Sequence, residues 1–136
     1  MKVTSDYAIE IKTGLAFDVV IERLNEFLTE EGFGVLTEID VKTTLKKKLN
    51  IDHKPYRILG ACNPQFANRA IKAEPLIGVL LPCNIVVWDD DATRTVAAME
   101  PDIMARIIKN PEIAAIAGEV SERIHRVIDR IGELNG

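Results

Sequence analysis

The chain has 136 residues, of which 47% are hydrophobic and 28% are charged, and its formal net charge is −4. This length suits one compact domain with its own core, so we predict a single domain over residues 1–136. The negative charge argues against nucleic acid or an anionic membrane surface as a partner. The longest apolar stretch, 75–88, is interrupted by Gly78, Pro82 and Asn84 and is too short to span a membrane.

The first half of the chain predicts three strands and two helices. Alternating apolar residues from Tyr7 to Lys12 predict a half-buried strand. Apolar residues at spacings of three and four predict a helix from Phe17 to a stop at Gly32. A second strand over 33–41, a short lysine-rich helix ending near Asn50 and a third strand over 56–61 follow.

The second half begins with a helix over 65–72 and strong strand signals. Leu76–Leu81 and Ile85–Trp88 are the most apolar strand candidates, and Pro82 between them predicts a break in the ladder. An aspartate-rich turn over 89–92 then leads into a returning strand over 93–99. We therefore expect an α+β protein with about five strands in a mainly antiparallel sheet.

The C-terminal third has helical periodicity. Pro101 opens a short helix through Ile107, and Asn110-Pro111-Glu112 has the capping residue, first-turn proline and early acid of a helix start. The long apolar stripe that follows predicts a helix that either closes the core or forms a dimer seam. His125 lies on this helix, and we expect it at the surface.

No export signal is evident in Met1–Asp6, so we expect a soluble cytoplasmic protein with reduced cysteines. Four lysines, at positions 42 and 46–48, are expected to lie on the solvent side of the short second helix.

Three segments resemble a known family: Gly32–Val41 (GFGVLTEIDV), Tyr56–Pro64 (YRILGACNP) and Ile77–Asn84 (IGVLLPCN). They are similar to the family catalogued as domain of unknown function 302. The resemblance implies a compact α+β fold, similar to one half of the TATA-binding-protein fold, and a tendency to form homodimers. It implies no activity and no DNA binding, because a fold does not carry a function.

The same dipeptide occurs twice, as Cys62-Asn63 and Cys83-Asn84, and these four residues are our candidates for a ligand-binding site. Cys62 precedes Pro64 at an expected helix start, where the helix dipole lowers the pKa of a thiol. Cys62 is therefore a candidate nucleophile, with Cys83 as its resolving thiol. Alternatively, both cysteines pack in the core and both asparagines act as local caps.

A metal site is a further alternative. Cys62 and Cys83 could bind zinc or copper, joined by His53 or by a ligand from a second subunit, although the sequence contains no CxxC or HExxH motif.

Three functions remain open: a small-molecule or soft-metal binding module at the Cys-Asn segments, a thiol enzyme or sulfur carrier using Cys62 and Cys83, and an interaction protein that acts through its C-terminal helix. How the strands that carry the two cysteines pair decides whether their side chains meet.

Overall fold

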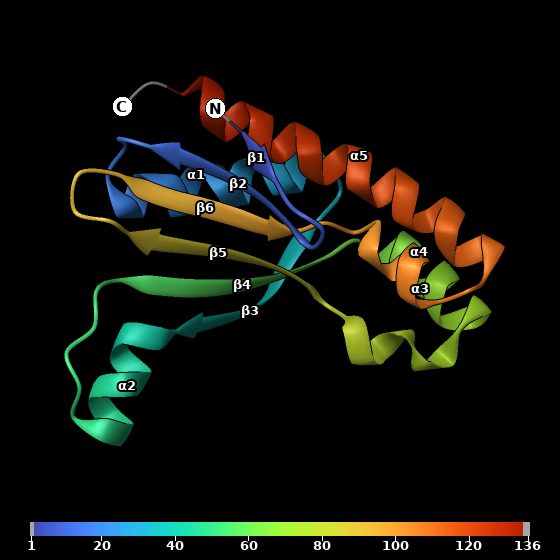
Figure 1. Ribbon diagram of the computed structural model, residues 1–136, viewed down its shortest axis with the longest axis horizontal. Coiled ribbons are helices and arrows are strands. Elements are labelled where there is room, and N and C mark those ends of the chain that lie inside the picture. The colour runs from blue at the N-terminus through green and yellow to red at the C-terminus, as the bar shows by residue number, and fades with distance from the viewer. Residues whose placement is uncertain (1, 135–136) are drawn as a thin grey trace.

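The chain folds into one antiparallel sheet with helices packed on it, as seen in the computed structural model, which describes residues 2–134 (Figure 1). The first half contains β1 (Val3–Thr4), β2 (Ala8–Thr13), α1 (Phe17–Glu30), β3 (Gly34–Asp40), α2 (Val41–Leu49) and β4 (Tyr56–Cys62). The second half contains α3 (Pro64–Ala73), the 3-10 helix η1 (Pro75–Leu80), β5 (Cys83–Asp89), β6 (Arg94–Met99), α4 (Ile103–Ile107) and α5 (Pro111–Glu133). The expected α+β class is confirmed.

The sheet has six strands in the order β1-β2-β6-β5-β4-β3. Every pairing among the described strands is antiparallel. The ladder between β3 and β4 shifts register between Val35 and Thr37, so Leu36 is the extra residue of a bulge. The count is close to the expected five. The sequence did not predict the short β1, which pairs with β2 at one edge of the sheet.

The prediction of a strand over Leu76–Leu81 is wrong, because Pro75–Leu80 form the 3-10 helix η1 and Leu81 lies just beyond its end. Pro75 opens η1, where its fixed φ angle and missing N–H fit a first helical position. Only Ile77 of this helix is buried, while Leu76 and Val79 are 74% and 82% exposed. A short apolar run has the same periodicity in either structure, so the sequence pattern could not separate the two.

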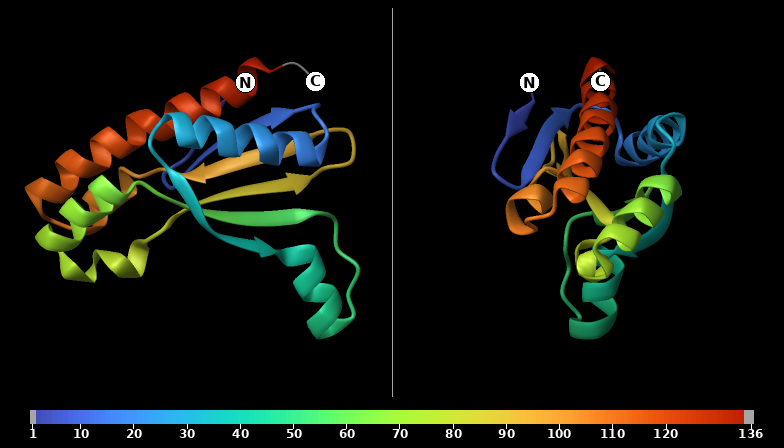
Figure 2. Two further views of the ribbon diagram at one scale, coloured as in Figure 1. Left: turned by 180° about the vertical axis from the view of Figure 1, so that it is seen from behind. Right: turned by 90° about the vertical axis from the view of Figure 1, so that its right-hand side faces the viewer.

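Helices α1 and α5 pack on the same face of the sheet (Figure 2). The inward side of α5 is buried along its whole length, and it meets the buried side of β2, where Ile9 and Ile11 lie. The outward side of α5 carries exposed charges such as Glu119, Glu122 and Arg126. The apolar stripe of α5 therefore closes the core, and the outward side lacks the apolar character of a dimer seam.

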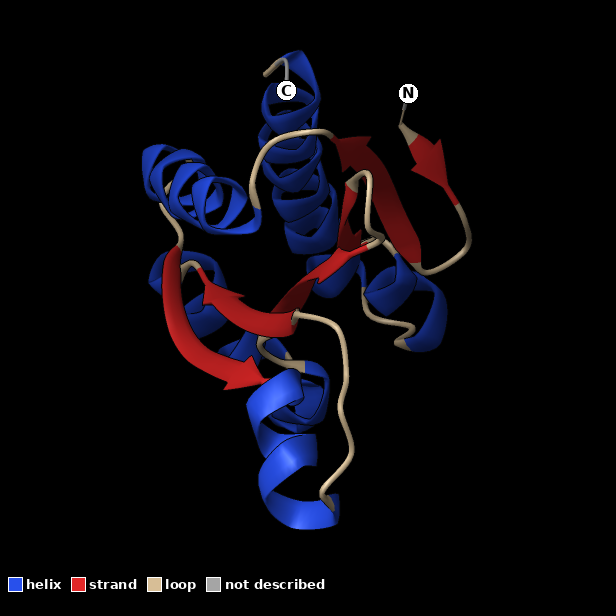
Figure 3. Cartoon of the chain, turned by 90° about the vertical axis from the view of Figure 1, so that its left-hand side faces the viewer, coloured by secondary structure: helices blue, strands red, loops and turns tan. Residues whose placement is uncertain are grey.

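Helix α2 lies at one end of the molecule and contributes no buried residue (Figure 3). Asp40 caps it by accepting a hydrogen bond from the backbone N–H of Thr43, and Asn50 ends it in the left-handed conformation. Its four lysines are exposed, as expected from the sequence. Within residues 2–134, none of the helices combines the length and the apolar character that a membrane crossing requires.

Candidate functional site

The two cysteines meet at one end of the sheet because β4 and β5 run antiparallel. Ala61 lies opposite Cys83 in this ladder, so the last residue of β4, Cys62, is next to the first residue of β5. An antiparallel pairing could have set the thiols apart, but here the end of one strand faces the start of the other. Cys83 is buried and Cys62 is half-buried, and neither forms a disulfide bond.

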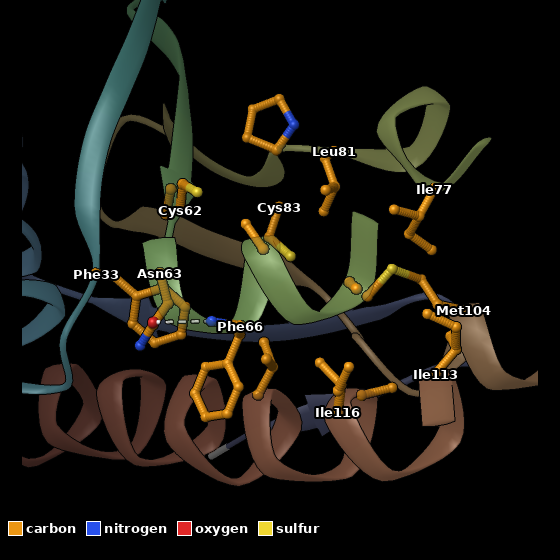
Figure 4. A pocket seen from close by; sticks show the side chains of 16 residues that line it. Phe33, Cys62, Asn63, Phe66, Ile77, Leu81, Cys83, Met104, Ile113 and Ile116 are labelled. Atoms are coloured by element: carbon orange, nitrogen blue, oxygen red, sulfur yellow. Dashed lines mark hydrogen bonds between the residues drawn. The ribbon is translucent and has the colours of Figure 1, made fainter. Parts of the chain in front are cut away.

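Both cysteines line a cavity of about 40 Å³ at this end of the sheet (Figure 4). Its walls are almost entirely apolar and come from β4, β5, η1 and the three helices α3, α4 and α5. The lining residues are Phe33, Ala61, Cys62, Asn63, Phe66, Ala67, Ala70, Ile77, Leu81, Pro82, Cys83, Met104, Ile113, Ile116, Ala117 and Val120. For comparison, a dry cavity of about 150 Å³ holds benzene and one water needs about 10 to 15 Å³. An occupant the size of an ion or of a few atoms fits.

Three of the lining side chains contain sulfur: Cys62, Cys83 and Met104. Met104 lies on α4 and is 5% exposed. It follows Cys83 by 21 positions in the sequence and has no spacing signal that relates it to either cysteine. Sequence reasoning missed it, because only the packing of α4 against α5 brings this thioether to the cavity that the cysteines line.

Asn63 acts as a cap. Its side-chain Oδ1 accepts hydrogen bonds from the backbone N–H groups of Gln65 at 3.2 Å and Phe66 at 3.4 Å, at the start of α3. Its Nδ2 lies 2.9 Å from where a Cβ of Gly32 would stand, and Gly32 has a positive φ of 86°. The amide oxygen is thus engaged by the start of α3, and the amide nitrogen packs closely against Gly32 in the turn after α1.

Asn84 lies on the opposite side of the sheet from Cys83. Successive residues of a strand point to opposite faces, and Asn84 is exposed where Cys83 and Ile85 are buried. Asn84 stands opposite Gly60 and lines a groove on the face that α1 and α5 leave free. The two Cys-Asn segments therefore do not form one site with four equivalent residues.

The predicted low pKa of Cys62 is wrong. Burial raises the pKa of the Cys62 thiol above its ordinary value. The backbone N–H groups at the start of α3 do not counter this effect, because two of them already donate hydrogen bonds to the side chain of Asn63. Burial, with a smaller contribution from the neighbouring Cys62, raises the pKa of Cys83 to about 11. Both thiols are protonated at neutral pH, which disfavours a nucleophilic role.

His53 does not join the cysteines. It precedes β4, its ring contacts Tyr56 edge-on, and it lies at the end of the strand opposite to Cys62. A strand of this length separates its ends by about 20 Å. Among residues 2–134, no group of three or more His, Cys, Asp or Glu side chains is placed to hold a metal ion. A site built from oxygen and imidazole ligands is therefore not preformed there.

His125 is half-buried in a polar network instead of lying free at the surface. Its Nε2 is 2.9 Å from Oε1 of Glu100, and its Nδ1 is 3.0 Å from Nζ of Lys2. A lysine only donates, so Nδ1 accepts and the Nε2–H group donates to Glu100. Ser121 donates to the second oxygen of the same carboxylate at 2.9 Å. This network joins α5 to the end of β6.

These features define a class of protein: a small α+β domain whose antiparallel sheet is covered by helices on one face and ends in a small apolar cavity lined by sulfur-containing side chains. A family model described as domain of unknown function DUF302 matches residues 8–131, so the chain belongs to that family. The crystal structure of an uncharacterised conserved DUF302 protein from Bacillus stearothermophilus is similar, with 31% sequence identity and a TM-score of 0.86 over 93% of this chain and 99% of that chain. No match is found among curated proteins.

Proposed function

We propose that this chain is a binding module for a soft monovalent metal ion such as Cu(I), held in the cavity between Cys62, Cys83 and Met104. The observation that carries the proposal is that three sulfur side chains, from β4, β5 and α4, line one small apolar cavity. Thiolate and thioether ligands select soft ions, whereas harder divalent ions prefer oxygen and nitrogen ligands.

The surroundings of the sulfurs support an ion over an organic ligand. The cavity of about 40 Å³ is far smaller than the roughly 300 to 1,000 Å³ of pockets for drug-sized molecules. Its one polar side chain, Asn63, already caps α3. A soft ion with few ligands needs neither a large volume nor further polar groups.

The same surroundings disfavour a thiol enzyme. A thiol attacks as its thiolate, and burial raises the pKa of both Cys62 and Cys83. A raised thiol pKa does not prevent metal binding in the same way, because a thiol that coordinates a metal ion loses its proton to the solvent. The proposal therefore predicts that uptake of Cu(I) releases protons and that the apparent affinity rises with pH.

The test is an anaerobic titration of the reduced protein with Cu(I) in competition with a chromophoric chelator. We expect one ion per chain, and at least a 100-fold loss of affinity in Cys83→Ser and in Cys62→Ser. Met104→Leu is expected to weaken binding by about tenfold, while Met99→Leu, the same substitution on the opposite face of the sheet, should leave it unchanged. Zn(II) should bind far more weakly.

Failure to bind Cu(I), or equal affinity in wild type and both serine variants, would overturn the proposal. Circular dichroism of each variant distinguishes a lost ligand from a lost fold. The pH dependence is an independent measurement, because a bound ion that releases no protons would not be coordinated by these thiols.

A further inference from the structure

A groove of about 740 Å³ lies on the face of the sheet opposite to α1 and α5, apart from the cavity of the cysteines. Strands β2, β6 and β5 form its floor, and α4 and η1 border one end. The lining residues are Ser5, Tyr7, Ala8, Glu10, Tyr56, Leu80, Asn84, Val86, Trp88, Ala97, Ala98, Met99, Ile103 and Ile107. Its volume is within the roughly 300 to 1,000 Å³ range of small-molecule sites.

Strand register explains why this face is hollow. Glu10 lies opposite Ala97, and Ala97 lies opposite Val86, so one row across the sheet has small side chains at its centre. The next row holds the large rings of Trp88 and Tyr56, which are paired across β5 and β4. Small side chains in one row beside aromatic side chains in the next leave a depression. The rings of Trp88 and Tyr56 form one side of it, which we call the aromatic wall.

The aromatic wall is held in a fixed arrangement. The rings of Tyr56 and Trp88 are stacked with centroids 5.7 Å apart and planes 6° from parallel. Trp88 donates its Nε1–H to Asp90 at 2.9 Å, which fixes the indole. Tyr7, 66% exposed, also lines the groove. Aromatic faces of this kind attract organic cations as well as apolar groups.

Glu10 is the one charged side chain among the lining residues. It forms no ion pair within residues 2–134. The cation two positions along the same strand, Lys12, is 3.4 Å from Asp90 and is thus engaged elsewhere. Covering this carboxylate with an apolar group alone would leave an uncompensated charge, so a ligand that also carries a positive charge is favoured.

We infer that the groove binds an amphipathic organic cation: an amine whose charge pairs with Glu10 and whose apolar body covers Val86, Ala97 and the aromatic wall. Ion pairing and ring contacts then act on one ligand. A second copy of the chain would fit this face less well, because a two-fold arrangement would bring two Glu10 carboxylates into one apolar interface without a cation to pair with them.

Trp88 is the single tryptophan of the chain, so its fluorescence reports directly on the groove. The probes are three ligands with one apolar body: 4-phenylbutylamine, 4-phenylbutan-1-ol and 4-phenylbutyrate. We expect the amine to change the fluorescence with an affinity at least tenfold above that of the alcohol, and the carboxylate to bind most weakly. Glu10→Gln should abolish the preference for the amine.

The matched control is Glu22→Gln, which removes the same charge from an exposed position on α1, away from the groove. This variant should keep the full preference. The inference is wrong if amine and alcohol bind equally well to the wild-type protein, or if the preference survives Glu10→Gln. It is also wrong if sedimentation reveals a dimer that Val86→Asp dissociates and if the amine binds neither form, because a second copy would then cover the groove.

Discussion

Gly60 lies directly against the ring of Pro82: a Cβ atom on this glycine would stand 2.7 Å from Cγ of the proline. The same Cβ would also collide with the side-chain oxygen of Thr37, from the neighbouring strand β3. Gly60 is buried in β4, two residues before Cys62 at the end of that strand. The lack of a side chain here lets the segment between η1 and β5 approach β4, which brings Cys83 to the end of that strand.

Gly60→Ala is expected to lower the free energy of unfolding by about 1 to 3 kcal/mol, the usual cost of forcing extra atoms into a packed core. Urea denaturation followed by circular dichroism measures the change. The control is Gly34→Ala, at the start of β3, because a Cβ there meets nothing within 4 Å. A variant at position 60 as stable as wild type would mean that Pro82 is not held against the strand.

Gly118 should respond in the opposite direction. It lies inside α5, and a Cβ added there has open space around it. Alanine in a helix interior is about 1 kcal/mol more favourable than glycine, so Gly118→Ala is expected to raise the free energy of unfolding by up to that amount. Thermal denaturation checks this. A loss of stability would indicate that a close neighbour approaches the helix at this position.

The buried thiol of Cys83 is expected to make the free energy of unfolding depend on pH in the alkaline range. Its pKa is raised from 9.0 to about 11 in the folded chain by burial and by the neighbouring Cys62. Between these values the unfolded chain releases the thiol proton while the folded chain keeps it, so stability falls as the pH rises. A difference of this size corresponds to a loss of about 2 to 3 kcal/mol that develops between pH 9 and 11.

The measurement is chemical denaturation of wild type and of Cys83→Ala at pH 8, 9, 10 and 11. Other groups titrate in this range in both proteins, so the slope difference between them isolates the thiol. The alanine variant is expected to start lower at pH 8, because it loses buried sulfur, and to decline less. Parallel slopes would mean that the thiol of Cys83 ionises freely in the folded chain.

Much of the fold could be predicted from short-range sequence patterns. The alternation around Ile9 and Ile11 and the cap at Asn63 each depend on neighbours a few residues away, and each was predicted correctly. The prediction of a strand over Leu76–Leu81 failed because the helical state of η1 depends on Pro75 and on the packing of Ile77, while the composition of the segment is that of a strand.

The candidate site was less accessible to sequence reasoning, because its parts come from distant segments. The sequence identified Cys62 and Cys83, but their proximity depends on the antiparallel register of β4 and β5. Met104 reaches the same cavity through tertiary packing alone. The pKa of Cys62 was wrongly predicted because dipole arguments ignore burial and the competition of the Asn63 cap.

The sequence did not indicate that the carboxylate of Glu100 accepts hydrogen bonds from His125 and Ser121 on α5. Burial disfavours the ionised carboxylate, but hydrogen bonds from His125, Ser121 and the backbone N–H of Asp102 outweigh that effect and hold the pKa of Glu100 below its ordinary value. A lowered pKa means that the carboxylate contributes stability above about pH 4.5, and that this contribution is lost as the pH falls through the lower, folded-state value.

Glu100→Gln keeps the shape of the side chain and removes the charge that His125 and Ser121 stabilise. At pH 7 we expect a loss of about 1.5 to 3 kcal/mol, the range for hydrogen bonds to charged groups. Glu119→Gln, which disrupts an exposed ion pair with Arg69, should stay within about 0.5 kcal/mol of wild type. Because wild-type Glu100 becomes protonated in acid, the difference between wild type and Glu100→Gln should shrink below pH 4.5. A difference that stays constant from pH 7 to pH 3 would contradict a role for the ionised carboxylate and would leave shape alone as the contribution of this side chain.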